Sequence, residues 1–236
     1  VHTYVDMIGT YHVQLLRSLR YGVATTVIAI VLAYPMAYWI AFRGGRHKST
    51  YLFLLLLPFF VTFVIRTISW QFLLADDGIV LGRLKGWGLV GQNFHVLATP
   101  YAVVGGLVYN FLPFMVLPIY VALERIDRSL LEAASDLYAT KREVFRRVVL
   151  PLSLPGVFAG VILTFVPAAA DYVNAQILGG SGQVMIGNII ETLYISNSQY
   201  PQASALSSIL LAALLIGIFV YARVLGTRDV LDASTG

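Results

Sequence analysis

The stretch that decides the fold is SLLEAASDLYATKREVFRRVVLP, residues 129–151, a polar segment between long apolar runs. Ser129 is followed three residues later by Glu132, and Thr140 is followed at the same distance by Glu143. A hydroxyl residue followed by a glutamate at this spacing is typical of a capping box at the start of a helix. The stretch therefore predicts two short helices joined by a turn.

Both predicted helices have one apolar face, because apolar residues recur in them at helical spacing. We expect Pro151 and Pro155 to end the second helix, since a proline ring removes a donor and clashes with the preceding turn. Basic residues surround the apolar faces and leave exposed apolar surface, which favours a docking partner over a segment that merely caps helices. These basic residues are Arg128, Lys141, Arg142, Arg146 and Arg147.

Composition indicates an integral membrane protein. Of the 236 residues 58% are hydrophobic and 12% are charged, with a mean hydropathy of +0.78, whereas a soluble domain has about 25% charged residues. The net charge of +4 does not indicate nucleic-acid binding, because the basic residues lie in short loops between apolar runs, where they set topology. The absence of cysteine excludes disulfides, thiolate metal sites and cysteine nucleophiles.

Five apolar runs predict an all-α, polytopic transmembrane helical bundle in a single domain. A run of about 20 residues crosses about 30 Å of hydrocarbon. In the fourth run, Gly156 and Gly160 have the small-xxx-small spacing that lets helices approach closely. Residues 1–20 are amphipathic and are expected to lie at the membrane surface. The expected spans are about 21–42, 51–74, 100–123, 155–178 and 203–222.

The distribution of basic residues orients the bundle. If loop 43–50, loop 124–154 and the C-terminal tail share one side, that side holds eleven of the sixteen lysines and arginines, and the other side holds four. The positive-inside rule then places loop 124–154 in the cytoplasm and the N-terminus outside. The eleven are Arg43, Arg46, Lys48, Arg125, Arg128, Lys141, Arg142, Arg146, Arg147, Arg223 and Arg228.

Segment 132–151 resembles the "EAA" loop of permease subunits of ATP-binding-cassette importers. That pattern is Glu-Ala-Ala, three residues, Gly, nine residues, Ile, one residue and Leu-Pro, and the chain matches its spacing throughout. Val148 stands for Ile, and Tyr138 stands for Gly. A bulky residue disfavours the positive φ that a glycine adopts in such a turn, so Tyr138 leaves the turn geometry open.

The resemblance implies an importer-permease (MetI-like) fold, in a bacterial inner membrane protein, with a cytoplasmic coupling loop at 124–154 that docks on a separate ATPase subunit. It implies a pair of ATPase subunits that bind ATP and Mg, a second permease subunit, expected to form a heterodimer, and an extracytoplasmic substrate-binding protein. Since this family has a core of five helices that one more usually precedes, a leading helix is expected to be missing from this sequence. The docking residues are expected to be Glu132, Ala133, Ala134, Asp136, Leu137 and Ala139.

Two longer stretches, residues 107–137 and 150–180, are similar to permeases of polyamine (spermidine/putrescine) importers. The similarity in order and spacing extends from about Arg20 to Val224 and implies an importer for polyamines. A secondary carrier or channel, with Arg66 and Asp171 as an ion relay, is the alternative from another class of protein.

Arg66 and Asp171 are the two charges at membrane depth. A charge there costs about 2.5 to 3.5 kcal/mol and usually faces a bundle interior or an aqueous path. Either these residues line the translocation route, or they form an ion pair between the second and fourth spans, or Arg66 extends toward the outer surface.

Other polar and aromatic residues in the spans complete a candidate translocation path. A carboxylate beside aromatic faces suits a cationic substrate, through charge pairing and cation–π contact. Asn110 has a second interpretation, a hydrogen bond between helices, which we favour. The candidate path consists of Arg66, Trp70, Asn110, Asp171, Tyr172 and Asn174.

The sequence has no motif of catalysis. It has no Gly-x-x-x-x-Gly-Lys-Ser/Thr, His-Glu-x-x-His or Gly-x-Ser-x-Gly pattern, and its four histidines have no metal-ligand spacing. The chain is thus expected to be a transport subunit with no metal site and no bound cofactor. Loop 179–188, rich in glycine, is expected either to receive the binding protein or to be a flexible connector.

Overall fold

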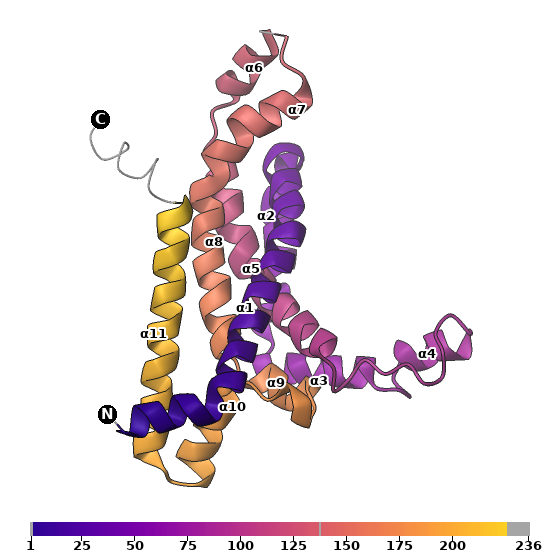
Figure 1. The fold of residues 1–236 in the computed structure, drawn as a ribbon. Coiled ribbons are helices and arrows are strands. Elements are labelled where there is room, and N and C mark those ends of the chain that lie inside the picture. Colours follow the sequence, from indigo (N-terminus) through magenta and orange to yellow (C-terminus); the bar gives the residue numbers. More distant parts are fainter. Residues whose placement is uncertain (1, 137, 226–236) are drawn as a thin grey trace. The chain divides into compact units, whose positions relative to one another are not determined.

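The computed structural model describes residues 2–136 and 138–225, and within these ranges every regular element is a helix (Figure 1). The α-helices are α1 (His2–Arg43), α2 (Lys48–Leu56), α3 (Phe63–Leu74), α4 (Leu81–Gly86), α5 (Pro100–Glu124), α6 (Arg128–Asp136), α7 (Lys141–Val144), α8 (Leu150–Ala170), α9 (Val173–Leu178), α10 (Ile186–Glu191) and α11 (Tyr200–Leu225). Short 3₁₀ or π turns occupy Gly45–His47, Leu57–Phe60, Phe145–Val149, Ser181–Gln183 and Thr192–Ser196.

Four helices in the described part of the chain are long and apolar enough to cross a membrane, or five if one bent pair counts as a span. The bent pair is Gly45–Phe60 with Phe63–Leu74. The other four are His2–Arg43, Pro100–Glu124, Lys141–Ala170 and Tyr200–Arg223. The polytopic all-α architecture expected from the apolar runs is therefore confirmed.

The chain divides into two compact units. Unit 1 contains residues Val1–Thr25, Val61–Asn110 and Phe165–Gly236, and unit 2 contains Thr26–Phe60 and Phe111–Thr164. The coupling loop lies in unit 2, and the residues of the candidate translocation path lie in unit 1.

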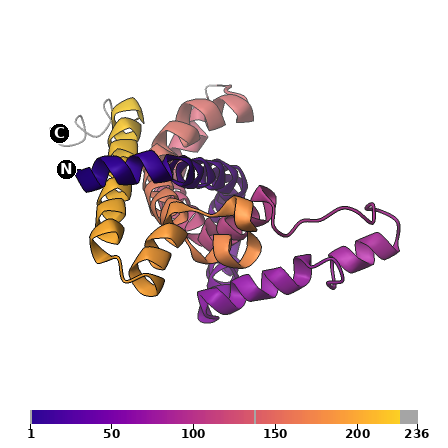
Figure 2. The ribbon, with the colours of Figure 1, turned by 60° about the horizontal axis from the view of Figure 1, so that its bottom comes forward.

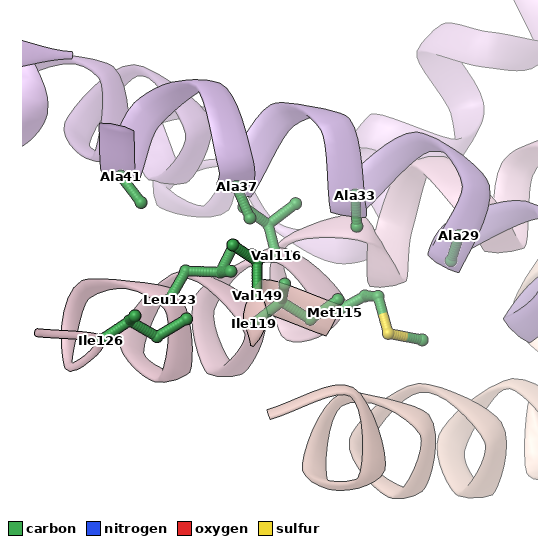
Figure 3. Packing of buried hydrophobic residues seen from close by; sticks show 10 residues of the cluster. All are labelled: Ala29, Ala33, Ala37, Ala41, Met115, Val116, Ile119, Leu123, Ile126 and Val149. Atoms are coloured by element: carbon green, nitrogen blue, oxygen red, sulfur yellow. The ribbon is translucent and has the colours of Figure 1, made fainter. Parts of the chain in front are cut away.

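The core of unit 2 is a stripe of alanines on α1 packed against larger side chains of α5 (Figure 3). Ala29, Ala33, Ala37 and Ala41 recur every four residues, so they share one face of the helix, and all are at most 2% exposed. Small side chains bring the two backbones close together and maximise van der Waals contact, which drives helix association in lipid. Their partners on α5 are Met115, Val116, Ile119 and Leu123.

Helix α8 also approaches α5 closely in unit 2, at the two glycines of the predicted small-xxx-small pair. A Cβ added to Gly156 would lie 2.5 Å from the carbonyl oxygen of Pro118, and one added to Gly160 would lie 2.7 Å from Met115 Sδ. Real Cβ atoms do not approach a backbone oxygen this closely, so the observed separation requires glycine at position 156, whereas the Met115 side chain can rotate away from a Cβ at position 160. The prediction of a close helix contact here is confirmed.

The core of unit 1 joins α10, α11 and the first turns of α1 (Figure 2). Ile186, Leu206 and Leu210 are buried there, and Tyr11 and Leu15 of α1 pack against them. Within the same unit, α3 packs against α9. Helix α4 is held near the end of α3 by an ion pair between Lys85 Nζ and Asp76 Oδ1 at 2.9 Å.

Residues 1–20 were expected to lie at the membrane surface, and that location stays a prediction. The described part, from His2, is continuous with the first span in one helix, α1. Val5, Ile8 and Val13 of this segment are about half or more exposed. A continuous helix forms because nothing between the two segments breaks it, and residues on its other side, such as Tyr11 and Leu15, make the packing contacts.

Two of the expected spans are interrupted. The second breaks at residues 61–62, where Thr62 is extended (φ −54°, ψ 138°) just after the 3₁₀ turn that contains Pro58. The fourth begins earlier, as α8 at Leu150, and breaks after Ala170 at Asp171 and Tyr172, before α9 starts. Mean hydropathy does not detect such breaks, because a non-helical residue in a protein interior can be as apolar as a helical one.

Candidate functional site

The coupling loop begins with a helix cap that differs from the predicted one. The backbone N–H of Ser129 donates to Asp127 Oδ1 at 2.9 Å, and α6 starts at Arg128. The predicted box of Ser129 with Glu132 is therefore wrong, because the carboxylate of Asp127 caps the helix two residues earlier. The same hydrogen bond from Ser129 lowers the pKa of Asp127.

The second predicted box, of Thr140 with Glu143, is confirmed. The N–H of Thr140 donates to Glu143 Oε2 at 2.8 Å, and the N–H of Glu143 donates to Thr140 Oγ1 at 3.4 Å. These bonds fix the start of α7. The hydrogen bond from the Thr140 backbone also lowers the pKa of Glu143, because it stabilises the carboxylate.

The turn between the two helices is left-handed at Tyr138, where φ is +57°. The N–H of Ala139 donates to the carbonyl oxygen of Ala134 at 3.2 Å. Of the two hydrogen bonds of a Schellman motif, this is the one that spans more residues, from the sixth residue back to the first. The turn thus keeps the backbone geometry that suits the glycine of the EAA pattern, although tyrosine occupies the position. The Tyr138 side chain is 96% exposed.

The predicted docking residues lie on or next to this pair of helices. Glu132 and Asp136 are exposed on α6, while Ala134 and Ala139 are half-buried. Ala133 belongs to α6, and Leu137 lies outside the described residues. A groove of about 290 Å³ runs between the helices and is lined by Ala134, Tyr138, Ala139, Glu143, Val144, Arg147 and Val148.

The second helix of the loop does not end at Pro151, and that prediction is wrong. Residues Phe145–Val149 form a π turn that leads directly into α8, with the N–H of Leu150 donating to Phe145 O. The wider turn accommodates the proline, whose missing N–H and bulky ring disrupt an ordinary α-helical turn. The loop is therefore continuous with a membrane helix.

Contacts within unit 2 hold this junction in place. The ring of Phe145 meets the rings of Tyr34 and Tyr38 edge-on, each at a centroid distance of 5.8 Å. The hydroxyl groups of Tyr34 and Ser153 are 2.8 Å apart and hydrogen-bonded. The coupling loop is thus fixed to α1 as well as to α8.

Basic side chains gather beside the groove. Arg142, Arg146 and Arg147 line a cavity of about 450 Å³ together with Glu143. One carboxylate among three guanidinium groups leaves this surface positive, so it suits an acidic partner surface.

A chain of hydrogen bonds in unit 1 brings three of the six predicted path residues together. Asn110 Nδ2 donates to Thr67 Oγ1 at 3.3 Å and to Asn174 Oδ1 at 3.2 Å. Asp171 Oδ1 then accepts from the backbone N–H of Asn174 at 2.8 Å and from its Nδ2 at 3.2 Å. The expected hydrogen bond from Asn110 to neighbouring helices is confirmed.

These polar groups are deeply buried. Asn110 is 1% exposed, Thr67 and Asn174 are fully buried, and Asp171 is 8% exposed. Asp171 stands where α8 has ended and α9 has yet to begin, and its carboxylate satisfies a backbone donor at the start of α9. The sequence analysis missed Thr67, although its hydroxyl is one of the few polar groups in the second apolar run.

The remaining predicted path residues lie on α3 and beside α9. Arg66 is 8% exposed, with its guanidinium carbon 5.8 Å from the ring centroid of Phe63. Trp70 meets the ring of Tyr109 edge-on at 5.2 Å. The Tyr172 side chain is 43% exposed, and its backbone oxygen accepts from Asn188 Nδ2 at 2.8 Å.

Loop 179–188 is anchored to α1 within unit 1. Arg17 Nη1 donates to Val184 O at 2.7 Å, the Tyr21 hydroxyl donates to Gln183 Oε1 at 2.5 Å, and the N–H of Ile186 donates to Ser18 Oγ at 2.8 Å. Three anchors along one short loop disfavour the alternative of a flexible connector.

Comparison with known proteins gives the family. Residues 18–228 match the family described as binding-protein-dependent transport system inner membrane component. The chain is 35% identical to the spermidine/putrescine transport system permease protein PotB of Haemophilus influenzae over 224 residues, which cover 94% of this chain and 78% of PotB. These relatives do not favour a secondary carrier or channel.

Solved structures agree on the fold. A methionine ABC transporter, MetNI, in an inward-facing conformation, contains a chain with a TM-score of 0.72 at 16% identity, covering 93% of this chain and 96% of that one. A bacterial ABC transporter for alginate import contains one with a TM-score of 0.71 at 18% identity, covering 95% and 84%. The chain belongs to the family of binding-protein-dependent transport system inner membrane components and is a multi-pass permease subunit of an ATP-binding-cassette importer.

Proposed function

We propose that this permease imports polyamines of the spermidine and putrescine type. The observation that carries the proposal is the 35% identity to PotB over 94% of this chain. A polyamine is an extended cation with apolar spacers between its amines. Its path therefore needs a few acceptors for charge and otherwise apolar or aromatic walls.

The buried network of unit 1 fits such a path. Asp171 supplies a carboxylate, and Asn174 and Asn110 extend a line of amide groups away from it toward α3. Trp70 and Tyr172 supply aromatic faces in the same unit. Within this proposal Asp171 binds a passing ammonium group, and Arg66 limits how long a cation stays by repelling it.

The coupling loop is the proposed docking site for the ATPase subunit, which binds ATP and Mg. Glu132, Ala134, Asp136 and Ala139 are its proposed contact residues, and the motif alone adds Ala133 and Leu137 to them. Because α7 continues into α8 through the π turn, a push on the loop moves a membrane helix directly. Within this proposal, closure of the ATPase pair is converted into opening of the path in this way.

The importer further contains a second permease subunit, proposed to be a different chain, and an extracytoplasmic binding protein. The anchored loop 179–188 is the proposed contact for that binding protein, because its backbone is held in one conformation by α1. A preorganised loop loses little entropy when a partner binds.

The test is uptake of radiolabelled spermidine into proteoliposomes that contain the complete importer, with ATP inside and the binding protein outside. We expect Glu132→Ala to lower uptake at least tenfold while the complex still assembles, and Asp171→Asn to lower uptake while ATP hydrolysis continues. The matched control is Asp77→Asn, an acid outside the proposed sites, which should retain uptake.

Three results would contradict the proposal. Uptake by the Asp171→Asn importer equal to that of the unmodified one would remove Asp171 from the path. Transport that needs no ATP would contradict the assigned energy source. Failure to take up a polyamine from a binding protein loaded with it would contradict the assigned substrate.

A further inference from the structure

Tyr138 adopts a backbone conformation that its side chain disfavours. Its φ of +57° lies in the left-handed region, where Cβ approaches the following carbonyl group. With 96% of the residue exposed, the ring gains almost no packing in this chain that could offset that cost. The turn is closed instead by backbone atoms, through the bond from Ala139 N–H to Ala134 O at 3.2 Å. Strain kept at an exposed site is typical of a residue whose side chain acts on a partner.

The surroundings of Tyr138 suit such a partner. Tyr138 is one of the residues that line the groove of about 290 Å³, and the apolar residues Ala139, Val144 and Val148 line it as well. Arg142 of α7 and Arg147 of the following π turn line the cavity beside the groove. The Thr140–Glu143 capping box fixes the backbone just after the turn. A rigid aromatic side chain next to an apolar floor and a basic rim has the composition of an interface anchor.

We propose that Tyr138 is an aromatic anchor that inserts into an apolar pocket on the ATPase subunit and helps the permease select its own ATPase. The inference rests on the proposed function of the loop and adds a residue to it. The occupant is the ATPase because Tyr138 lines the same groove as Ala134, one of the proposed docking residues. Acidic side chains are expected beside the pocket, where they meet Arg142 and Arg147.

The test measures the affinity of the purified ATPase subunit for the permease complex in lipid nanodiscs. Tyr138→Gly and Tyr138→Asn remove the ring but accept a positive φ, so they keep the turn. Tyr138→Phe keeps the ring and removes the hydroxyl. We expect Gly and Asn to weaken binding about tenfold or more, as for an interface anchor, and Phe to bind within about twofold of the unmodified complex.

The control is Tyr101→Asn, because Tyr101 is also an exposed tyrosine, at 83%, but lies at the start of α5 outside the loop. It should leave ATPase affinity unchanged. Exchange of the Ala139 amide proton checks that the turn survives in each Tyr138 variant, since that amide closes the turn.

Three outcomes would overturn the proposal. The first is unweakened binding by Tyr138→Gly or Tyr138→Asn. The second is equal weakening by Tyr138→Phe, which would assign the contact to the hydroxyl group. The third is a loss seen in nanodiscs but absent in detergent, which would assign the ring to the lipid surface. If Glu132→Ala still abolishes coupling in any of these cases, the proposed docking function stands and only the anchor fails.

Discussion

The backbone strain at Tyr138 has a measurable effect on the turn that contains it. A non-glycine residue in the left-handed region costs about 1–2 kcal/mol. Glycine avoids this cost, but its greater conformational freedom in the unfolded loop cancels part of the gain. We expect Tyr138→Gly to stabilise the turn by about 1 kcal/mol and to slow hydrogen exchange of the Ala139 amide about fivefold. Tyr138→Val, β-branched and unsuited to positive φ, should speed exchange. Equal rates in all three proteins would show that the turn is not strained.

Asn110 joins α3, α5 and α9 through two hydrogen bonds, so its removal should loosen unit 1. Hydrogen bonds between membrane helices contribute about 0.6 kcal/mol each on average, and loss of a buried donor leaves Asn174 Oδ1 short of a partner. We expect Asn110→Ala to lower the melting temperature of the detergent-solubilised importer by about 2–6 °C. Asn197→Ala, in an exposed turn, should leave it unchanged. A melting temperature unaffected by Asn110→Ala would mean that the network does not stabilise the fold.

For individual residues, the sequence predicted which polar side chains matter but not which groups they form hydrogen bonds with. Asp171 and Asn110 are conspicuous because they lie in apolar runs, and both are buried. Asn110 meets Thr67 and Asn174 only after three helices have packed, and no spacing in the sequence encodes that contact. Asp171 was predicted as a charge inside a span, whereas the carboxylate lies at a helix break and satisfies a backbone donor there.

Among the elements, the two capping boxes show what local spacing can and cannot predict. Thr140 and Glu143 form the expected box because no better acceptor precedes them. Ser129 and Glu132 have the same spacing, but Asp127 two residues earlier is a stronger acceptor and moves the helix start. Choosing between two candidate caps requires comparing both, and a pattern matched at one position makes no such comparison.

The Thr140–Glu143 box also predicts a pH dependence. The pKa of Glu143 is lower in the folded loop than in an unfolded chain, where it is about 4.3, so the cap contributes fully above that value and is lost as the pH falls through the folded pKa. In an NMR titration we expect the Glu143 carboxyl carbon and the Thr140 amide proton to shift together, with a midpoint below about 4.3. The Thr140 amide of Glu143→Gln should not titrate. A midpoint at or above the unfolded value would contradict the geometry of the cap.

The contact of α5 with α8 gives a second prediction at the scale of elements. A Cβ on Gly156 would lie 2.5 Å from the backbone oxygen of Pro118, which cannot rotate away as a side chain does. We expect Gly156→Ala to destabilise the protein by about 1–3 kcal/mol, through forced separation of the helices. Gly105→Ala on α5 is the control, because a Cβ there meets no atom within 4 Å. Thermal unfolding in detergent compares the two, and similar curves would refute the close approach.

For the whole molecule, the apolar runs predicted the membrane architecture because the thickness of the hydrocarbon layer fixes how long a span must be. The interruptions at residues 61–62 and at Asp171 were missed, since they depend on local backbone geometry inside apolar sequence. The continuation of the coupling loop into α8 was missed for the opposite reason. Pro151 predicts a helix end, and the π turn that removes the conflict has no signal in the periodicity.

That π turn predicts the effect of a one-residue deletion on transport. A π turn holds one residue more than an α turn, and one residue corresponds to about 100° of rotation along a helix. Deleting Val148 should convert the turn to an α-helical one and rotate the coupling loop by about 100° relative to α8. We expect helical content and membrane insertion to be retained while ATPase binding and uptake are lost. Val148→Ile, which keeps the chain length and an apolar side chain in the groove, should retain both, and a deletion variant that still transports would show that the direction of the loop is unimportant.

The number of residues in the π turn, rather than any one side chain, thus sets the orientation of the proposed docking surface relative to α8. A permease that gained one residue between Phe145 and Val149 would keep every proposed docking residue but would orient them differently relative to α8. Swapping coupling loops between importers is therefore expected to succeed only when the π turn travels with the loop.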